Sequence, residues 1–338
     1  MRVVVTHNPE DLAAYYGRAL PELEKLVEVV RNPLDRDLST AELCELASDG
    51  AVIVAHRSTP GPPALFEALP DLVAFLRCAV DISTIDVDAA SRAGVLIARA
   101  DKSFVASTAE LALGLALAAA RGIGASTTDY QRGDEPPQRP GRQLAGSTAG
   151  LIGFGDIARH LAGLLRAAGM TVIAHDPAMT DPDDGIEMVA LDDLLARAHV
   201  VFPLVPGGPA TTGLIGRREL ALTAPGTILV NVSRGEVLDE DAVADAYDRG
   251  HLGGLAMDVG RATDQRPSPA LAARPGVVAT PHLGGLTPQN ADAQARSTVE
   301  QVRAMLEGEM PPRSVNPDAA HRLRAYWNRV GIDPGSPR

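Results

Sequence analysis

Cysteine is scarce in this chain, which has only Cys44 and Cys78 among its 338 residues. Two thiols are too few for a disulfide framework, and no group of cysteines and histidines has the spacing of a zinc site. We therefore expect two reduced thiols and no bound metal.

Positive charge is also in short supply. The 31 Lys and Arg residues are outnumbered by 43 Asp and Glu residues, which gives a net charge of −12 with no basic stripe. This balance argues against nucleic acid or an anionic membrane surface as a partner. No apolar run is long enough to span a membrane, and the N-terminus MRVVVTHNP is typical of a core strand and not of a signal peptide. We expect a soluble cytoplasmic protein with a small-molecule partner.

The single tryptophan, Trp327, lies in a C-terminal tail rich in Pro, Arg and Asn. We expect it to anchor this tail to the rest of the protein. The alternative is an exposed residue at a contact with a partner.

Short apolar runs and helical patterns alternate along the chain, which indicates an α/β fold with parallel sheets. Strands are predicted at 3–5, 51–55, 72–77 and 95–97, and six further strands at 148–152, 171–175, 200–204, 227–231, 254–258 and 277–280. A long helix from Thr287 and Pro288 to near Gly308 can return the chain to the first sheet. Two domains follow, one from residues 1–101 plus 288–338 and one from residues 102–287. The polar stretch 122–142 is expected to be a surface excursion.

A glycine-rich turn between a strand and a helix is the most informative motif. It reads Gly153-Phe154-Gly155-Asp156-Ile157-Ala158. Gly153 allows a tight bend, Gly155 allows close approach of a pyrophosphate, and the following helix N-terminus favours negative charge. The next strand delivers Asp176, where a carboxylate can accept hydrogen bonds from a ribose diol and would repel a 2′-phosphate. The motif therefore predicts NAD as cofactor, in preference to NADP.

Polar residues follow three other strands of the same predicted sheet. Arg234, Asp258 and His282 come at or just after the ends of these strands, where such sheets bind ligands. An arginine there could hold a carboxylate and polarise a carbonyl, and a histidine could exchange a proton near neutral pH. Taken singly, Arg234 could brace a loop, His282 could be a core residue and Asp258 could cap a turn.

With these motifs, the chain resembles the D-isomer-specific 2-hydroxyacid dehydrogenases. The matching stretches are RCAVDISTIDVDAASRAGV, STAELALGLALAAARG, LAGSTAGLIGFGDIARHLA, VPGGPATTGLIGRREL, LVNVSRGEVLDEDAV, LAMDV and VATPHLGG, over most of residues 70–290. The resemblance implies two Rossmann-like or flavodoxin-like domains, with the NAD domain inserted into the substrate domain, and a homodimer formed through the NAD domains.

The resemblance also implies site roles. Arg234 would bind substrate, His282 would be the acid/base, Asp176 would bind the adenosine ribose and Asp258 the nicotinamide carboxamide. Further cofactor contacts would come from the glycine turn and from Thr108, Pro206, Val232 and Gly284.

Two positions depart from the family pattern. The glutamate that normally lies five residues after the aspartate of LAMDV, and pairs with the histidine, is Thr263 here, with Asp264 next to it. The loop expected to bind the substrate carboxylate carries Asp81 where the family usually has glycine. We hypothesise that Asp81 supplies the carboxylate that position 263 lacks, and a solvent-facing loop aspartate is the alternative.

The leading interpretation is an NAD-dependent oxidoreductase that interconverts a D-2-hydroxy acid and a 2-oxo acid. One alternative is hydride transfer without a proton relay, as in the related formate dehydrogenases, which would account for Thr263. The other is a nicotinamide-sensing binding protein, as in the corepressors that share the fold.

Overall fold

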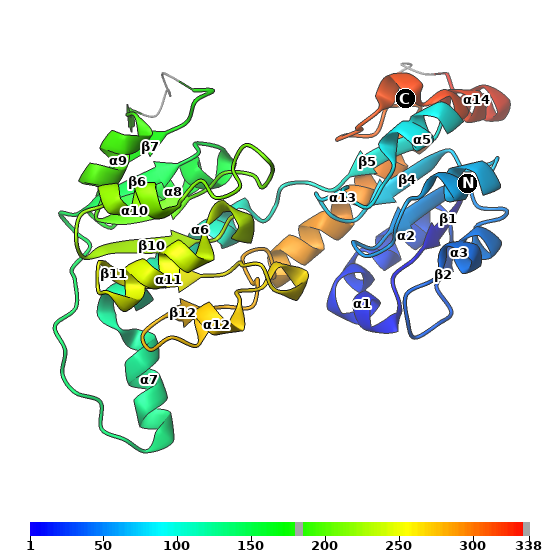
Figure 1. Cartoon of the computed structure of the whole chain (residues 1–338). Helices are drawn as coiled ribbons and strands as arrows, with labels where there is room; N and C mark the ends of the chain where they lie inside the picture. Colours follow the sequence, from blue (N-terminus) through cyan, green and yellow to red (C-terminus); the bar gives the residue numbers. More distant parts are fainter. Residues whose placement is uncertain (180–184, 334–338) are drawn as a thin grey trace. The chain divides into compact units, whose positions relative to one another are not determined.

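The computed structural model describes residues 1–179 and 185–333 and divides the chain into two compact units (Figure 1). Unit 1 is made of Met1–Ser103 and Pro288–Arg338, and unit 2 is Phe104–Thr287. Each unit contains one parallel sheet, so the predicted α/β class with two parallel sheets is confirmed.

The sheet of unit 1 has five strands in the order β2-β1-β3-β4-β5. All its pairings are parallel, as expected when a crossover separates successive strands. The central strands are fully buried because helices cover both faces. The strands are β1 (Arg2–Val5), β2 (Glu28–Arg31), β3 (Val52–Ala55), β4 (Ala74–Arg77) and β5 (Leu96–Arg99).

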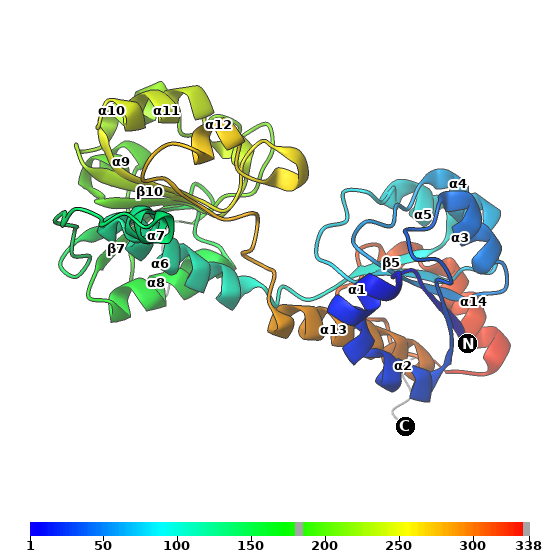
Figure 2. The ribbon, with the colours of Figure 1, turned by 90° about the horizontal axis from the view of Figure 1, so that it is seen from below.

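Two apolar layers cover the faces of this sheet (Figure 2). One layer is formed with α2 (Leu20–Leu26), α13 (Pro288–Glu307) and α14 (His321–Val330). The other is formed with α3 (Thr40–Leu46), α4 (Pro63–Ala68) and α5 (Val87–Ala93). The remaining helical segments of the unit are α1 (Pro9–Ala14) and the 3₁₀ turns η1 (Tyr16–Arg18) and η4 (Pro317–Ala319).

The sheet of unit 2 has seven parallel strands in the order β12-β11-β10-β9-β6-β7-β8. This is the doubly wound Rossmann order, with its switch point between β6 and β9. The strands are β6 (Thr148–Ile152), β7 (Thr171–His175), β8 (Glu187–Met188), β9 (Val200–Pro203), β10 (Thr227–Asn231), β11 (Leu252–Met257) and β12 (Val278–Ala279).

Helices again cover both faces of this second sheet (Figure 2). On one face lie α6 (Val105–Arg121) and α8 (Asp156–Ala167). On the other lie α9 (Leu191–Arg197), α10 (Arg217–Leu222), α11 (Glu240–Asp248) and α12 (Pro269–Ala272). The unit also contains α7 (Ile123–Arg132) and the 3₁₀ turns η2 (Gly235–Val237) and η3 (Thr263–Gln265).

Strands β2 and β8 and helix α7 were not predicted from the sequence. The edge strands β2 and β8 are short and largely solvent-accessible, so they lack the apolar run that predicts a buried strand. The stretch 122–142, expected to be a surface excursion, begins with α7, a helix that has no buried residue. Helix α6 begins at Val105, so Ser107 and Thr108 lie inside it.

Trp327 is 3% exposed and packs in the apolar layer formed with α13 and β3. Its indole N–H donates to the carbonyl of Met305 at 2.7 Å. Trp327 is therefore the anchor that the sequence predicted for the C-terminal tail.

Within residues 1–179 and 185–333, no single helix has the length and apolar character needed to cross a membrane. Helices α6 and α7 pass that test only as a pair, and the chain bends by 68° between them. Six residues of α6 are buried within the protein.

Candidate functional site

The glycine turn follows β6 and requires glycine at its first position. Gly153 has a φ of +90°, and its N–H donates to the carbonyl of His175 at 2.7 Å. A Cβ there would lie 2.8 Å from the carbonyl oxygen of Leu204 and 2.9 Å from a methyl group of Val205. Both the left-handed backbone and the close approach to the β9 loop therefore exclude a side chain.

The second glycine leaves open space above a helix N-terminus. Gly155 is the N-cap of α8, and a Cβ added to it would meet no atom within 4 Å. Because glycine has no side-chain acceptor, the N–H groups of the first helical turn are left for a ligand, and the helix dipole favours an anionic one. The space and the donors both fit a dinucleotide pyrophosphate. Asp156 and Ile157 are the first two residues of this helix.

Asp176 lies beside this turn, at the end of β7. One carboxylate oxygen accepts the N–H of Phe154 at 2.9 Å, and the other accepts the N–H of Ala178 at 2.9 Å. Phe154 itself is buried, and the Arg159 guanidinium lies 4.8 Å from the centre of its ring. Each oxygen of Asp176 keeps acceptor capacity for a ribose hydroxyl, since an ionised carboxylate offers about four acceptor positions.

Asp258 shapes the loop that carries His282. Its carboxylate is almost fully buried and accepts three hydrogen bonds from that loop: Thr280 Oγ1 at 2.6 Å, the N–H of Leu283 at 2.7 Å and the N–H of Gly284 at 2.8 Å. The turn-capping alternative considered for Asp258 is therefore present in the structure. Its contact with a nicotinamide carboxamide stays a prediction.

His282 sits in this loop with a φ of +62°, which is unusual for a residue with a side chain. Its N–H donates to the carbonyl of Asp258 at 2.9 Å. Its ring nitrogen Nδ1 lies 3.1 Å from the carbonyl oxygen of Asp264. Because a carbonyl only accepts, this contact places a proton on Nδ1 and leaves Nε2 as the ring nitrogen available for proton exchange.

The partner of His282 is thus a backbone carbonyl. The Asp264 carboxylate lies 4.0 Å from the guanidinium of Arg266, and Asp264 has a φ of +58°, within the η3 turn that begins at Thr263. In the sequence, the candidates for this role were the side-chain acids Asp81 and Asp264. The Asp264 carbonyl could not be predicted, because every residue has a carbonyl and its contacts leave no signature in the sequence.

Arg234 follows β10 in a tightly packed loop. Its side chain is exposed, and Nη1 donates to the carbonyl of Ser233 at 2.7 Å. Its own carbonyl accepts from the side-chain amide of Asn231 at 2.9 Å. A Cβ on the next residue, Gly235, would lie 2.1 Å from the backbone of Gly260, so only glycine allows these two loops to meet. The loop thus presents the guanidinium at the carboxyl edge of the sheet.

The other predicted cofactor residues lie around the same strand ends. Thr108 is buried in α6 and would be 3.3 Å from a Cβ on Gly284, and Ser107 Oγ donates to the carbonyl of Gly284 at 2.8 Å. Val232 is buried directly after β10. Pro206 follows β9, and its carbonyl accepts from Thr211 Oγ1 at 2.6 Å.

Asp81 belongs to unit 1. Its carboxylate accepts the N–H of Ser83 at 2.9 Å. Burial lowers the pKa of Arg77 to about 10, and the negative charge of Asp81 partly opposes that shift. The hypothesis that Asp81 replaces the family glutamate connects residues of two units, and it stays a prediction.

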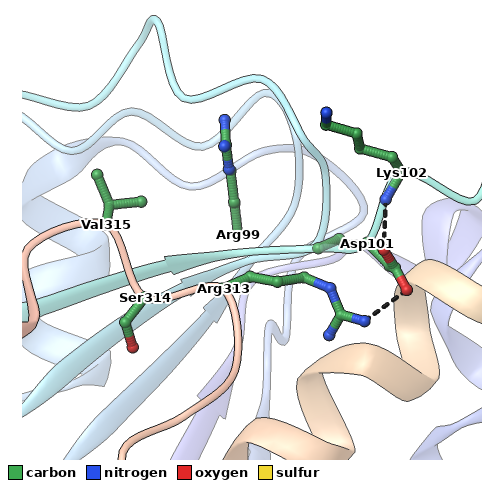
Figure 3. Close-up of a pocket in the computed structure, with 7 residues that line it drawn as sticks. Arg99, Asp101, Lys102, Arg313, Ser314 and Val315 are labelled. Carbon is green, nitrogen blue, oxygen red and sulfur yellow. Dashed lines mark hydrogen bonds and ion pairs between the residues drawn. The ribbon is translucent and has the colours of Figure 1, made fainter. Parts of the chain in front are cut away.

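A groove of about 390 Å³ lies in unit 1 where β5 ends (Figure 3). Arg313 pairs there with Asp101, and this hydrogen bond holds the pKa of the Asp101 carboxyl below its usual value. The groove contains none of the predicted site residues. Its lining residues are Arg99, Ala100, Asp101, Lys102, Arg313, Ser314 and Val315.

A Rossmann sheet with this glycine turn, an open helix N-terminus and an acid after the second strand defines a dinucleotide-binding protein. The family of this chain follows from its similarity to known proteins. Residues 113–284 match the model described as the D-isomer specific 2-hydroxyacid dehydrogenase, NAD binding domain.

Curated relatives and solved structures agree with this match. D-3-phosphoglycerate dehydrogenase of Mycobacterium bovis is 36% identical over 83% of this chain and 53% of its own length. Hydroxypyruvate reductase of Thermotoga maritima is 33% identical over 83% of this chain and 90% of its own length. D-lactate dehydrogenase with NAD⁺ from Lactobacillus jensenii has the same fold, with a TM-score of 0.81 and 23% identity over 93% of this chain and 99% of its own.

The chain therefore belongs to the D-isomer-specific 2-hydroxyacid dehydrogenase family, and the predicted NAD cofactor is confirmed by the match of unit 2 to the family's NAD-binding domain. The chain spans about half the length of the phosphoglycerate dehydrogenases it matches.

Proposed function

We propose that this protein catalyses the NAD-dependent interconversion of a D-2-hydroxy acid and a 2-oxo acid, with unit 2 as the NAD domain and unit 1 as the substrate domain. The observation that carries the proposal is the placement of Arg234, Asp258 and His282 after β10, β11 and β12. These strands are neighbours in one parallel sheet, so their carboxyl ends lie at one edge.

Arg234 would orient the substrate. Its guanidinium stays protonated at any working pH and has a planar fork of donors that matches a carboxylate and the adjacent C2 oxygen. When bound, NAD would accept the hydride from C2 of the hydroxy acid. Arg234 would polarise the C2 carbonyl in the reverse direction.

His282 would exchange the proton. The Asp264 carbonyl holds the tautomer protonated on Nδ1, so Nε2 can take the hydroxyl proton of the substrate during oxidation. In the reverse direction the same Nε2 would return that proton to the C2 oxygen. A carbonyl stabilises the imidazolium less than a carboxylate does, because it carries only a partial negative charge.

The activity test follows NADH absorbance with hydroxypyruvate, D-3-phosphoglycerate and D-lactate, the compounds in the names of the related enzymes, each offered with the matching cofactor form. We expect turnover on at least one of them. His282→Asn should lower kcat by about 10²–10⁴-fold, the usual contribution of a general acid/base. Arg234→Gln should raise KM and lower kcat together.

The missing glutamate supports one alternative, hydride transfer from formate, which needs no proton relay. Turnover of formate with NAD that survives His282→Asn would favour it over the 2-hydroxy acid reaction. NADH binding without turnover of any of these substrates would favour the other alternative, a nicotinamide-sensing binding protein.

We also propose a homodimer formed through the NAD domains. Three exposed apolar side chains lie on α6 and α7: Leu117, Ile123 and Tyr130, the last 67% exposed. Exposed apolar side chains on two successive helices favour a subunit interface there. In Figure 1, α7 projects from the rest of unit 2.

Light scattering coupled to size-exclusion chromatography tests this interface. Ile123→Asp combined with Tyr130→Asp should convert a dimer into a monomer. Val330→Asp is the control, since Val330 is similarly exposed but belongs to α14 in unit 1. A monomeric wild-type protein, or a dimer that survives the double substitution, would contradict the proposal.

A further inference from the structure

The carboxyl edge of the sheet in unit 1 carries a second group of polar side chains. Asp11 lies in α1 after β1, Asp37 lies in the loop after β2, and His56 follows β3. These three strands are adjacent in the order β2-β1-β3, and the direction of winding reverses between β1 and β3. In flavodoxin-like sheets, ligands bind at this switch point.

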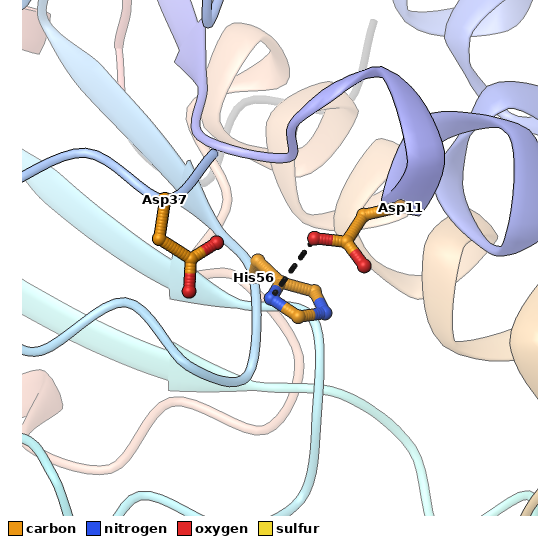
Figure 4. A group of neighbouring side chains, drawn as sticks. All are labelled: Asp11, Asp37 and His56. Atoms are coloured by element: carbon orange, nitrogen blue, oxygen red, sulfur yellow. Dashed lines mark ion pairs between the residues drawn. The ribbon is translucent and has the colours of Figure 1, made fainter. Parts of the chain in front are cut away.

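The three side chains converge (Figure 4). One donor atom from each of Asp11, Asp37 and His56 lies within 4.8 Å of the other two. His56 Nδ1 is 3.6 Å from Asp11 Oδ2, and it is 2.8 Å from Ser58 Oγ, which donates to Asp37 at 2.6 Å. A tetrahedral ion with bonds of about 2.0–2.1 Å separates its donors by about 3.4 Å, so the His56–Asp11 pair is already near that spacing.

A second imidazole lies against this group without a hydrogen-bond partner on one nitrogen. His7 is 1% exposed, and its Nδ1 is buried with no partner among the described residues. Its ring centre lies 4.9 Å from that of His56, in an edge-to-face arrangement. A buried nitrogen without a partner is costly, which makes it an independent sign that a ligand belongs nearby.

We propose that Asp11, Asp37 and His56 form a binding site for a divalent transition-metal ion of the zinc class. One imidazole nitrogen and two carboxylate oxygens suit such an ion better than Mg²⁺ or Ca²⁺, which prefer oxygen ligands throughout. His56 would bind the ion as the tautomer protonated on Nε2, so that Nδ1 presents its lone pair to the ion in place of its contact with Ser58 Oγ.

The charges of the group favour a cation. A carboxylate oxygen of Asp11 lies within 4.8 Å of one from Asp37, and an ion bound between them would offset the repulsion of the two charges. It would do so against the nearby positive charges of Arg57 and Arg77.

The ion would connect three segments that meet only in the folded unit. It would connect α1, the loop between β2 and α3, and the residue after β3. Because the unfolded chain does not hold these ligands together, binding would stabilise the native state in proportion to the logarithm of the metal concentration.

The test uses the full chain, stripped with a chelator and desalted, then titrated with Co²⁺ and followed by visible absorption and calorimetry. We expect one Co²⁺ per chain with the intense visible bands of a tetrahedral site, and displacement by Zn²⁺. Asp11→Asn, Asp37→Asn and His56→Gln should each weaken binding by more than about 100-fold, since even second-layer partners of a metal change affinity by 10–100-fold.

Two matched controls separate ligands from general negative charge. Glu10→Gln removes a charge from α1 next to Asp11, and Asp35→Asn removes one from the loop that carries Asp37. Both should weaken Co²⁺ binding far less than the ligand substitutions do, because each removes a nearby charge and not a ligand. Circular dichroism checks that each variant folds, and Zn²⁺ should raise the Tm of the wild-type protein but not that of Asp37→Asn.

Two results would overturn the site. One is a wild-type chain that binds no Co²⁺ or Zn²⁺ at millimolar concentration. The other is equal weakening by Glu10→Gln and Asp37→Asn, which would mean diffuse attraction to an acidic surface. Metal binding and the Tm are measured without dehydrogenase activity, so the test of this site is independent of the proposed reaction.

Discussion

Replacing Asp176 should separate its two roles, support of the glycine turn and recognition of NAD. The carboxylate accepts one N–H from Phe154 and one from Ala178, both at 2.9 Å. In Asp176→Ala both donors lose their acceptor. The partly buried N–H of Phe154 cannot be fully rehydrated, whereas Ala178 is exposed and can bind water. We expect the free energy of unfolding to fall by about 1–3 kcal/mol, the range for an unsatisfied buried donor.

The loss in cofactor affinity should be at least as large. A hydrogen bond to a charged acceptor contributes about 1.5–3 kcal/mol, so losing the ribose contact should raise the Kd for NADH by about 10–150-fold. Asp176→Asn keeps one side-chain oxygen and the shape of the residue. It should therefore cost less stability, and it should reduce discrimination against NADPH because the repelling charge is gone.

Urea unfolding and fluorescence titration with NADH and NADPH measure these effects. Asp248→Ala is the control, because this exposed aspartate pairs with Arg274 in the same unit, away from the glycine turn. A Kd for NADH within twofold of wild type in Asp176→Ala would refute the assignment of Asp176 to the ribose. A change in affinity without any change in stability would refute its support of the turn.

Three further predictions concern glycine, histidine and cysteine. Gly153→Ala places a Cβ 2.8 Å from the Leu204 carbonyl at a φ of +90°, so urea unfolding should show a loss of at least about 1–2 kcal/mol, and NADH titration should show weaker binding; wild-type values in both assays would contradict this account. Burial holds the pKa of His7 well below 6.5, so on acidification the unfolded chain takes up a proton that the folded chain does not. The free energy of unfolding should therefore keep its full value above about pH 6.5 and fall below it by up to about 1.4 kcal/mol per pH unit. The slope should be shallower in His7→Phe. An unchanged slope in that variant would show that His7 is not the group responsible. Burial raises the pKa of Cys78 to about 12, so a thiol reagent at pH 8 should label Cys44 first in the native protein and Cys78 only after unfolding; rapid labelling of Cys78 in the native state would refute its burial.

The sequence by itself determined the fold class, the dinucleotide turn and the family. These features depend on residues close together in the chain. The alternation of apolar strands and helices predicts parallel sheets, and the turn from Gly153 to Ala158 with Asp176 lies within one strand–helix–strand unit. Trp327 was also predicted to be an anchor, because burying a large apolar ring is favourable.

The tertiary structure decided what the functional side chains contact. Sequence could state that position 263 lacks the glutamate, but only the fold places the Asp264 carbonyl on His282, because a backbone group carries no residue signature. The three hydrogen bonds that Asp258 accepts from the loop of His282 likewise could not be predicted from the sequence.

The same reason explains the group formed by Asp11, Asp37 and His56. The sequence predicted no metal, since it offered no short-range ligand spacing. These residues follow three different strands, and they meet because parallel strands bring their carboxyl ends to one edge of the sheet. Patterns within one segment can be read from the order of the residues, whereas contacts between segments exist only after the chain has folded.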